Sequence, residues 1–141
     1  MAIEKTVSRE KHSDLKTHVD ERRIRAAIEA AETGTSGSIH VSIAEHIRGK
    51  THGTAARAFK SLGYATPGSA AVLFFVVPSR RELSVLGGEA IHARVGDAYW
   101  HKLVAAVVKR VRDEDLTSAL VHGIEEVGRE LSRHFPSTSD R

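Results

Sequence analysis

Residues 68–100 read GSAAVLFFVVPSRRELSVLGGEAIHARVGDAYW and hold the strongest structural pattern in the sequence. The run 70–77 is apolar at both alternating sets of positions, which is typical of a central strand buried on both faces. The turn at 78–80 is short enough for a hairpin, so we expect 81–86 to return antiparallel, nearer the sheet edge. Helices should therefore cover both faces of the sheet.

The residues before this stretch predict a helix, a strand and a second helix. The first helix begins between Thr17 and Asp20, where apolar residues start to recur at helical spacing. Residues 38–47 alternate between apolar and polar, as a half-buried strand does. Residues 51–62 again show helical spacing. A strand, a helix and the strand 70–77 form a βαβ unit, whose two strands should be parallel.

The residues after the hairpin predict a turn and more helix. Gly87-Gly88 leads into a short helical piece at 89–93, and a longer helix follows Gly96 with Asp97 as its N-cap. A last helix follows an acidic turn in which Asp115 is the cap. The fold predicted is a three-layer α/β/α sandwich on a small mixed sheet, built from a βαβ unit and a hairpin.

The length of 141 residues predicts one domain. We expect a flexible N-terminal segment at 1–16, the folded domain at 17–136 and a tail at 137–141. The chain has no cysteine, which excludes disulfides and thiolate metal sites and fits a reducing compartment. Its opening residues lack the apolar core of a signal peptide, and 70–77 is far shorter than the roughly 20 residues that span a bilayer. We therefore expect a soluble, cytoplasmic protein.

The charge pattern does not favour nucleic-acid binding. Lys and Arg number 21 against 18 Asp and Glu, so the formal net charge is only +3. The basic residues are spread along the chain, and aromatic residues, which stack on bases, make up only 5%.

A candidate ligand site is the turn between the second hairpin strand and the following helix. Such turns direct backbone N–H groups at ligands, and helix N-termini favour anions. The candidate ligand-binding residues are Gly87, Gly88, Glu89 and His92. The alternative is that the two glycines only relieve backbone crowding, since neither a G-x-G-x-x-G nor a Walker pattern is present.

The sequence evidence for a metal site is weaker than that for the ligand site. Asp97 and His101 are four residues apart on one helix face and could ligate a metal with Glu89 or His92. The alternative is a helix cap beside an unrelated surface histidine. The acidic turn at 113–115 lacks the pattern of a calcium loop and is better explained as a solvated connection between helices, with Asp115 as cap. The sequence also lacks a G-x-S-x-G elbow.

Short motifs spread over 17–136 resemble the TPM domain, often called TPM-phosphatase, and most closely its small stand-alone bacterial members without a membrane anchor. These motifs are Thr35-Ser36-Gly37-Ser38-Ile39-His40-Val41, Ala58-Phe59, Leu62-Gly63, Val72-Leu73-Phe74, Arg80-Arg81, Leu86-Gly87, Ile91-His92, Val95-Gly96, Trp100, Gly123-Ile124, Gly128, Leu131 and Phe135-Pro136. The resemblance implies an α/β/α sandwich. It also implies an acid phosphatase activity or divalent-metal binding, which some members of the family have, although many have no settled activity.

The chain departs from the family at three polar positions. The family commonly has an acidic residue where this chain has Ser38, Asn-Gly at Ala70-Ala71, and Gly-Asp at Gly87-Gly88. Divalent cations need carboxylate or carbonyl oxygens, so these changes remove most of such a site. Glu89 and Asp97 remain nearby as substitutes.

Two functional hypotheses follow from the residues and the resemblance. The first is a non-catalytic module that binds a protein partner or a small anionic ligand and has lost most of the family's acidic metal site. The second is a weak acid phosphatase-type hydrolase that uses Ca²⁺ or Mg²⁺ held by Glu89, Asp97 and Asp115.

Overall fold

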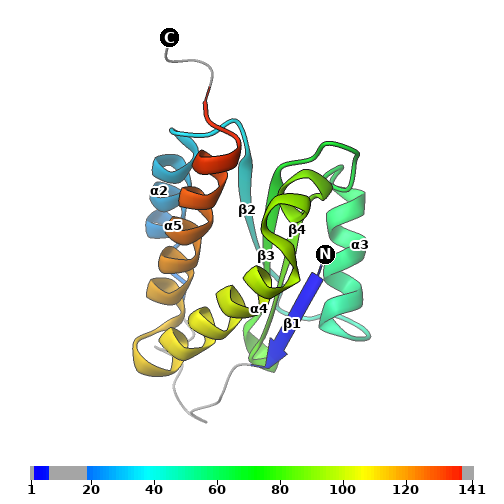
Figure 1. Cartoon of the computed structure of the whole chain (residues 1–141). Coiled ribbons are helices and arrows are strands. Elements are labelled where there is room, and N and C mark those ends of the chain that lie inside the picture. The colour runs from blue at the N-terminus through cyan, green and yellow to red at the C-terminus, as the bar shows by residue number, and fades with distance from the viewer. Residues whose placement is uncertain (1, 7–18, 138–141) are drawn as a thin grey trace.

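A computed structural model describes residues 2–6 by their backbone and residues 19–137 with their side chains. The described elements are β1 (Ala2–Thr6), α2 (Glu21–Glu32), β2 (Ser38–Ile43), α3 (Thr51–Ser61), β3 (Ala71–Val77), β4 (Glu82–Gly87), α4 (Glu89–Asp113) and α5 (Leu116–His134). A short 3₁₀ turn, Pro78–Arg80, joins β3 to β4. Figure 1 shows their arrangement.

The four described strands form one mixed sheet in the order β1-β4-β3-β2. β2 and β3 are parallel, with Ser38 opposite Ala71, and β3 and β4 form the antiparallel hairpin, with Val77 opposite Glu82. Every residue of β3 is buried. The predicted βαβ unit and hairpin are confirmed. The expectation that 81–86 lies nearer the sheet edge is wrong, because β1 pairs with the other side of β4 and leaves β3 and β4 each one strand from an edge.

Strand β1 lies within the segment 1–16 that the sequence predicts to be flexible. Its sequence AIEKT is short and carries charge, so it lacks the apolar pattern that identifies an interior strand. Residues 7–16 lie outside the described part of the chain. So do residues 138–141 of the predicted tail, while Ser137 donates its N–H to the carbonyl of Gly34 at 3.1 Å.

Helices α2, α4 and α5 cover one face of the sheet and α3 covers the other (Figure 1). The larger core centres on Trp100 and Phe74, and the smaller core packs Ala55 and Phe59 of α3 against Leu73 and its neighbours. The predicted three-layer α/β/α sandwich is therefore confirmed.

Two element boundaries differ from the sequence prediction, and a third agrees with it. β2 ends at Ile43, short of the predicted residue 47, because its partner strand β3 ends one residue beyond the Ile43–Val76 pair. Gly96 interrupts α4 with φ 79° and ψ 172°, so Gly96, and not Asp97, is the flanking non-helical residue. Asp115 caps α5 as predicted, since its carboxylate accepts the Ser118 N–H at 2.7 Å.

Candidate ligand-binding cleft

A cleft of about 530 Å³ opens where α3, the loop after it, the end of β4 and the start of α4 meet. Phe59 and Lys60 form its α3 wall, Leu86 its floor, and Glu89 and His92 its α4 wall. The fold thus gathers most of the predicted ligand-binding residues around one hollow. The predicted turn supplies only one wall, because α3 contributes the other.

The double glycine is required by packing at this turn. A Cβ on Gly87 would overlap the ring of Trp100, and a Cβ on Gly88 would overlap Ser69. The N–H of Gly88 donates to the Ala71 carbonyl at 2.8 Å, and the Ala90 N–H donates to the Ser69 carbonyl at 2.9 Å. Gly87 lines the cleft and Gly88 does not. The close approach to Ser69 therefore explains the glycine at position 88 fully. The N–H groups of Gly88 and Ala90 bind carbonyls of the chain itself and are not available to a ligand.

His92 is held by a buried partner. The indole N–H of Trp100, a fully buried residue, donates to Nδ1 of His92 at 3.0 Å. An indole nitrogen can only donate, so Nδ1 must accept, and a neutral imidazole then carries its proton on Nε2. Nε2 lies 3.6 Å from a carboxylate oxygen of Asp97, and a third of the His92 side chain is exposed. His92 therefore offers an N–H donor at the cleft and no free lone pair.

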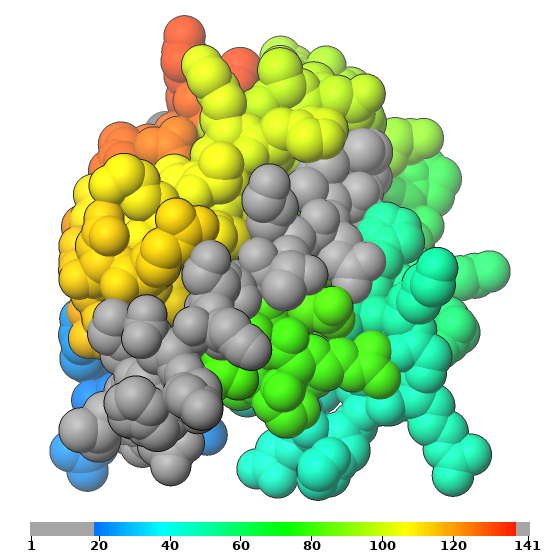
Figure 2. All heavy atoms as spheres, turned by 90° about the horizontal axis from the view of Figure 1, so that it is seen from below, coloured from blue at the N-terminus to red at the C-terminus, as the bar shows by residue number. Residues whose placement is uncertain are grey.

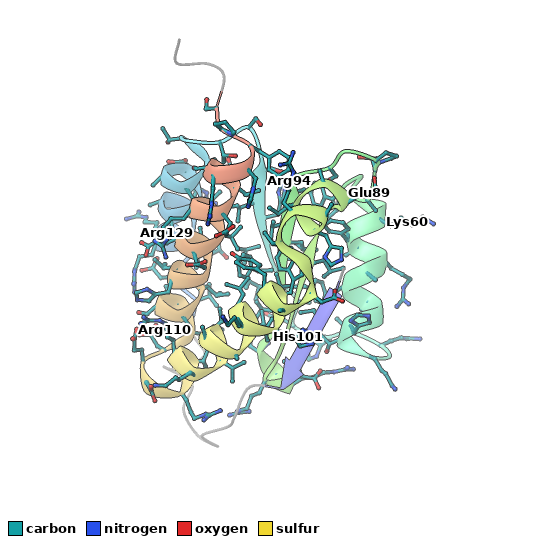
Figure 3. The ribbon with its side chains drawn as sticks, viewed as in Figure 1. Lys60, Glu89, Arg94, His101, Arg110 and Arg129 are labelled. Atoms are coloured by element: carbon teal, nitrogen blue, oxygen red, sulfur yellow. The ribbon has the colours of Figure 1, made fainter. Side chains whose placement is uncertain are left out.

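The cleft carries one charge of each sign. Lys60 is exposed at the end of α3 and Glu89 is exposed at the start of α4. Figure 3 shows Lys60 extending outward from α3 and Glu89 at the beginning of α4. Neither side chain has an ion-pair partner among the described residues. A ligand in the cleft would thus meet an ammonium group, a carboxylate and the His92 N–H above an apolar floor.

The predicted metal ligands do not come together. Asp97 lies beside His92, but Nδ1 of His101 contacts the Asp97 backbone carbonyl at 3.0 Å and not its carboxylate. Asp115 lies beyond the far end of α4, about 27 Å from Asp97 at the usual helical rise. Within the described residues, no three His, Asp or Glu side chains form a group that could hold a metal. These residues do not fit Ca²⁺ or Mg²⁺, which need several oxygen ligands.

A second polar cluster lies on the α3 side of β2, and the sequence pattern did not single it out as a unit. The hydroxyl of Tyr64 contacts Nδ1 of His40 at 3.0 Å, and the Ser38 hydroxyl contacts Nε2 at 2.9 Å. The two rings stack with their centroids 4.1 Å apart. Burial lowers the pKa of His40, although the Glu32 carboxylate acts in the opposite direction. This cluster anchors the loop after α3, which forms part of the cleft wall.

Comparison with known proteins identifies the family of the chain. The sequence model of the TPM domain matches residues 13–130. The chain belongs to the TPM domain family. A search of curated proteins found no match.

Solved structures share this fold. The NMR structure of the BA42 protein from the psychrophilic bacterium Bizionia argentinensis is similar, with a TM-score of 0.77 and 26% sequence identity over 91% of both chains. The N-terminal domain of the cg2496 protein from Corynebacterium glutamicum has a TM-score of 0.64 and 18% identity, over 97% of this chain and 91% of that one. None of the helices in the described residues is long and apolar enough to cross a membrane.

The positions that the resemblance to TPM domains singles out as departures lie side by side. Ser38 is opposite Ala71 across β2 and β3, and its N–H donates to the Ala70 carbonyl at 3.1 Å. Gly88 bonds to the Ala71 carbonyl. The three departures therefore meet at one end of the sheet, next to the cleft, and only Ser38 retains a polar side chain there.

Proposed function

We propose that this TPM domain is a non-catalytic binding module whose ligand occupies the cleft between α3 and α4. The main support for the proposal is the hydrogen bond that Nδ1 of His92 accepts from Trp100. A general base or a metal ligand needs a free imidazole lone pair, and the Trp100 N–H occupies the one that the neutral ring offers. The departures implied by the resemblance support the same conclusion, since Ser38 is uncharged where the family commonly has an acidic residue, and Ala71 and Gly88 carry no polar side chain.

The chemistry of the walls favours a small anionic ligand with an apolar portion. Lys60 and the Nε2–H of His92 supply donors to an anionic group, and Phe59 and Leu86 supply apolar surface. The Glu89 carboxylate would repel a second negative charge and accept a hydrogen bond from a ligand hydroxyl. A singly charged hydroxy acid such as lactate meets these demands better than a polyphosphate does.

Trp100 provides a direct reporter of binding, because it is the single tryptophan of the chain and contacts both Gly87 and His92. Titration with lactate should change its fluorescence, and inorganic phosphate, which is partly doubly charged at neutral pH, should bind less tightly. Lys60→Met should raise the Kd obtained from this titration about tenfold, the usual scale for one charge-assisted contact. Arg57→Met is the matched control, since Arg57 is exposed on the same helix but outside the cleft. Equal responses in both variants would remove the cleft from the proposal.

The phosphatase hypothesis makes a separate demand. The protein should hydrolyse p-nitrophenyl phosphate in millimolar Ca²⁺, Mg²⁺ or Mn²⁺, and bound metal should raise its melting temperature. We expect neither. Turnover that Asp97→Ala abolishes while leaving the fold intact would overturn the non-catalytic proposal.

A further inference from the structure

Positive charge that is not balanced by acidic residues is concentrated in one stretch of the chain. Between His46 and Arg81 the sequence contains no Asp or Glu, and its basic residues are Arg48, Lys50, Arg57, Lys60, Arg80 and Arg81. This stretch builds the loop before α3, α3 itself, the loop after it and β3. Its long side chains stand out at one side of the molecule in Figure 2, where residues 45–60 are cyan to turquoise.

The opposite layer is organised differently. On α4 and α5, charges of both signs alternate and pair along the helix, as in Lys109–Asp113 at 2.8 Å and Arg129–Glu126 at 2.9 Å. Such pairs largely neutralise the surface. α3 and its N-cap Lys50, by contrast, contain no acidic residue, and Lys50 and Lys60 are exposed without an ion-pair partner among the described residues. The asymmetry therefore lies in the placement of charge and not in the net charge of the chain.

We propose that the exposed side of α3 and the loop before it form a docking surface for an acidic segment of a partner protein. We call this the basic face and define it by Arg48, Lys50, Arg57, Lys60 and Leu62. The proposal does not depend on the ligand of the cleft, since only Lys60 belongs to both sites.

Hydrogen bonds from Arg80 and Thr54 hold the loop that carries Arg48 and Lys50. The guanidinium of Arg80 donates to the carbonyls of Ile47 at 3.0 Å and Gly49 at 2.5 Å. The Thr54 hydroxyl donates to the Arg48 carbonyl at 3.2 Å. The guanidinium of Arg80 therefore binds the loop backbone, while the side chains of Arg48 and Lys50 are exposed to solvent. A loop that is ordered before binding loses less conformational entropy when a partner docks.

The remaining charges lie along α3 at a spacing that suits an extended peptide. From Lys50 to Lys60 the helix rises about 15 Å, which an extended segment spans with about five residues. Arg57 lies between them, with only a weak 3.4 Å contact to Thr54 on its own helix. Leu62, the C-cap of α3, lies beyond the Lys60 end of the row on the side of the helix that carries Ala55 and Phe59. It is 55% exposed, the more exposed of the two large hydrophobic side chains that are exposed among the described residues. An acidic segment complements the row, and an apolar side chain just past its end can reach Leu62.

The same surface is less suited to nucleic acid. Binding single strands usually requires exposed aromatic rings, but Phe59 is buried and Tyr64 is half-buried against His40. The acidic groups at the margins are few. Glu45 begins the loop, Glu82 accepts the hydroxyl hydrogen of Thr51, and Glu89 lies across the cleft. The exposed Leu62 favours a partner that brings apolar as well as acidic side chains.

The test uses the full chain and a labelled peptide of about ten residues, mostly glutamate with one leucine near its end. Fluorescence anisotropy at about 50 mM salt should detect binding that weakens as the salt concentration rises. The double variant K50E/R57E should raise Kd at least about tenfold. The control R22E/R25E makes the same change in net charge at two exposed sites on α2 and should stay within about twofold of the wild type. Replacing the peptide leucine by alanine should weaken binding about threefold.

Several results would overturn the proposal. Equal losses in both charge variants would show that net charge alone attracts the peptide. So would failure of the wild type to bind at low salt. Tighter binding of a single-stranded oligonucleotide, lost in K50E/R57E, would assign the surface to nucleic acid, and equivalent binding to phosphatidylglycerol vesicles would assign it to lipid. If K50E/R57E does not fold by circular dichroism, the milder pair R48Q/K50Q measured against R22Q/R25Q gives a comparison that is again matched in net charge.

Discussion

Gly87→Ala should destabilise the protein by about 1–2 kcal/mol. The added methyl group would overlap the ring of Trp100 and lie 3.3 Å from Cγ2 of Ile91. Trp100 is fully buried, so it cannot move aside without disturbing the core. Overpacking of this kind costs about 1–3 kcal/mol. Loss of glycine entropy from the unfolded chain offsets up to about 1 kcal/mol of that cost.

The same substitution at Gly53 is the matched control and should have the opposite sign. Gly53 lies in α3, and a Cβ there would meet only the Arg57 guanidinium at 3.8 Å. Alanine in a helix is favoured over glycine by about 0.5–1 kcal/mol. Urea unfolding followed by circular dichroism gives both free energies of unfolding. Equal effects of the two substitutions would refute the close contact between Gly87 and Trp100.

Three further predictions test the polar contacts and the break in α4. Trp100→Phe should destabilise by about 2–3 kcal/mol, because it leaves Nδ1 of His92 without its donor and opens a cavity, as measured by urea unfolding. Gly96→Ala should cost about 1–3 kcal/mol by calorimetry, since φ 79° and ψ 172° are reached almost only by glycine. Burial lowers the pKa of His40, so the unfolded chain binds this proton more readily. Stability should therefore fall as the pH drops below about 6.5, and His40→Gln should weaken that dependence in pH-resolved melts.

The sheet and its helices were predictable because their signals are local. The apolar run of β3 and the stripe around Trp100 identify buried elements from spacing alone. The place of 81–86 in the sheet was not predictable in this way. It depends on β1, whose partner strand is some 80 residues away and whose five residues carry little apolar pattern. Long-range pairing of a short edge strand leaves almost no trace in local sequence.

The candidate site was predictable in part. The strand-to-helix turn with Gly87, Glu89 and His92 could be found because glycine marks it. The opposite wall could not, since Phe59 and Lys60 read simply as the end of an amphipathic helix. The predicted pairing of Asp97 with His101 followed from the spacing of four residues on a helix. Gly96 breaks the helix just before Asp97, and this brings the Asp97 carboxylate to His92 instead.

The link between core and cleft passes through one hydrogen bond. Trp100 belongs to the apolar stripe of α4, and its size accounts for the glycine at position 87. The same side chain determines which nitrogen of His92 carries the proton. A residue that serves packing therefore also determines what the cleft can do. A variant such as Trp100→Phe would free Nδ1, and only then would His92 regain the lone pair that a base or a metal ligand requires. Since no group of three His, Asp or Glu side chains surrounds that nitrogen among the described residues, divalent metal should leave the melting temperature of both Trp100→Phe and the wild type unchanged. Stabilisation of the wild type by metal would contradict the occupied state of Nδ1.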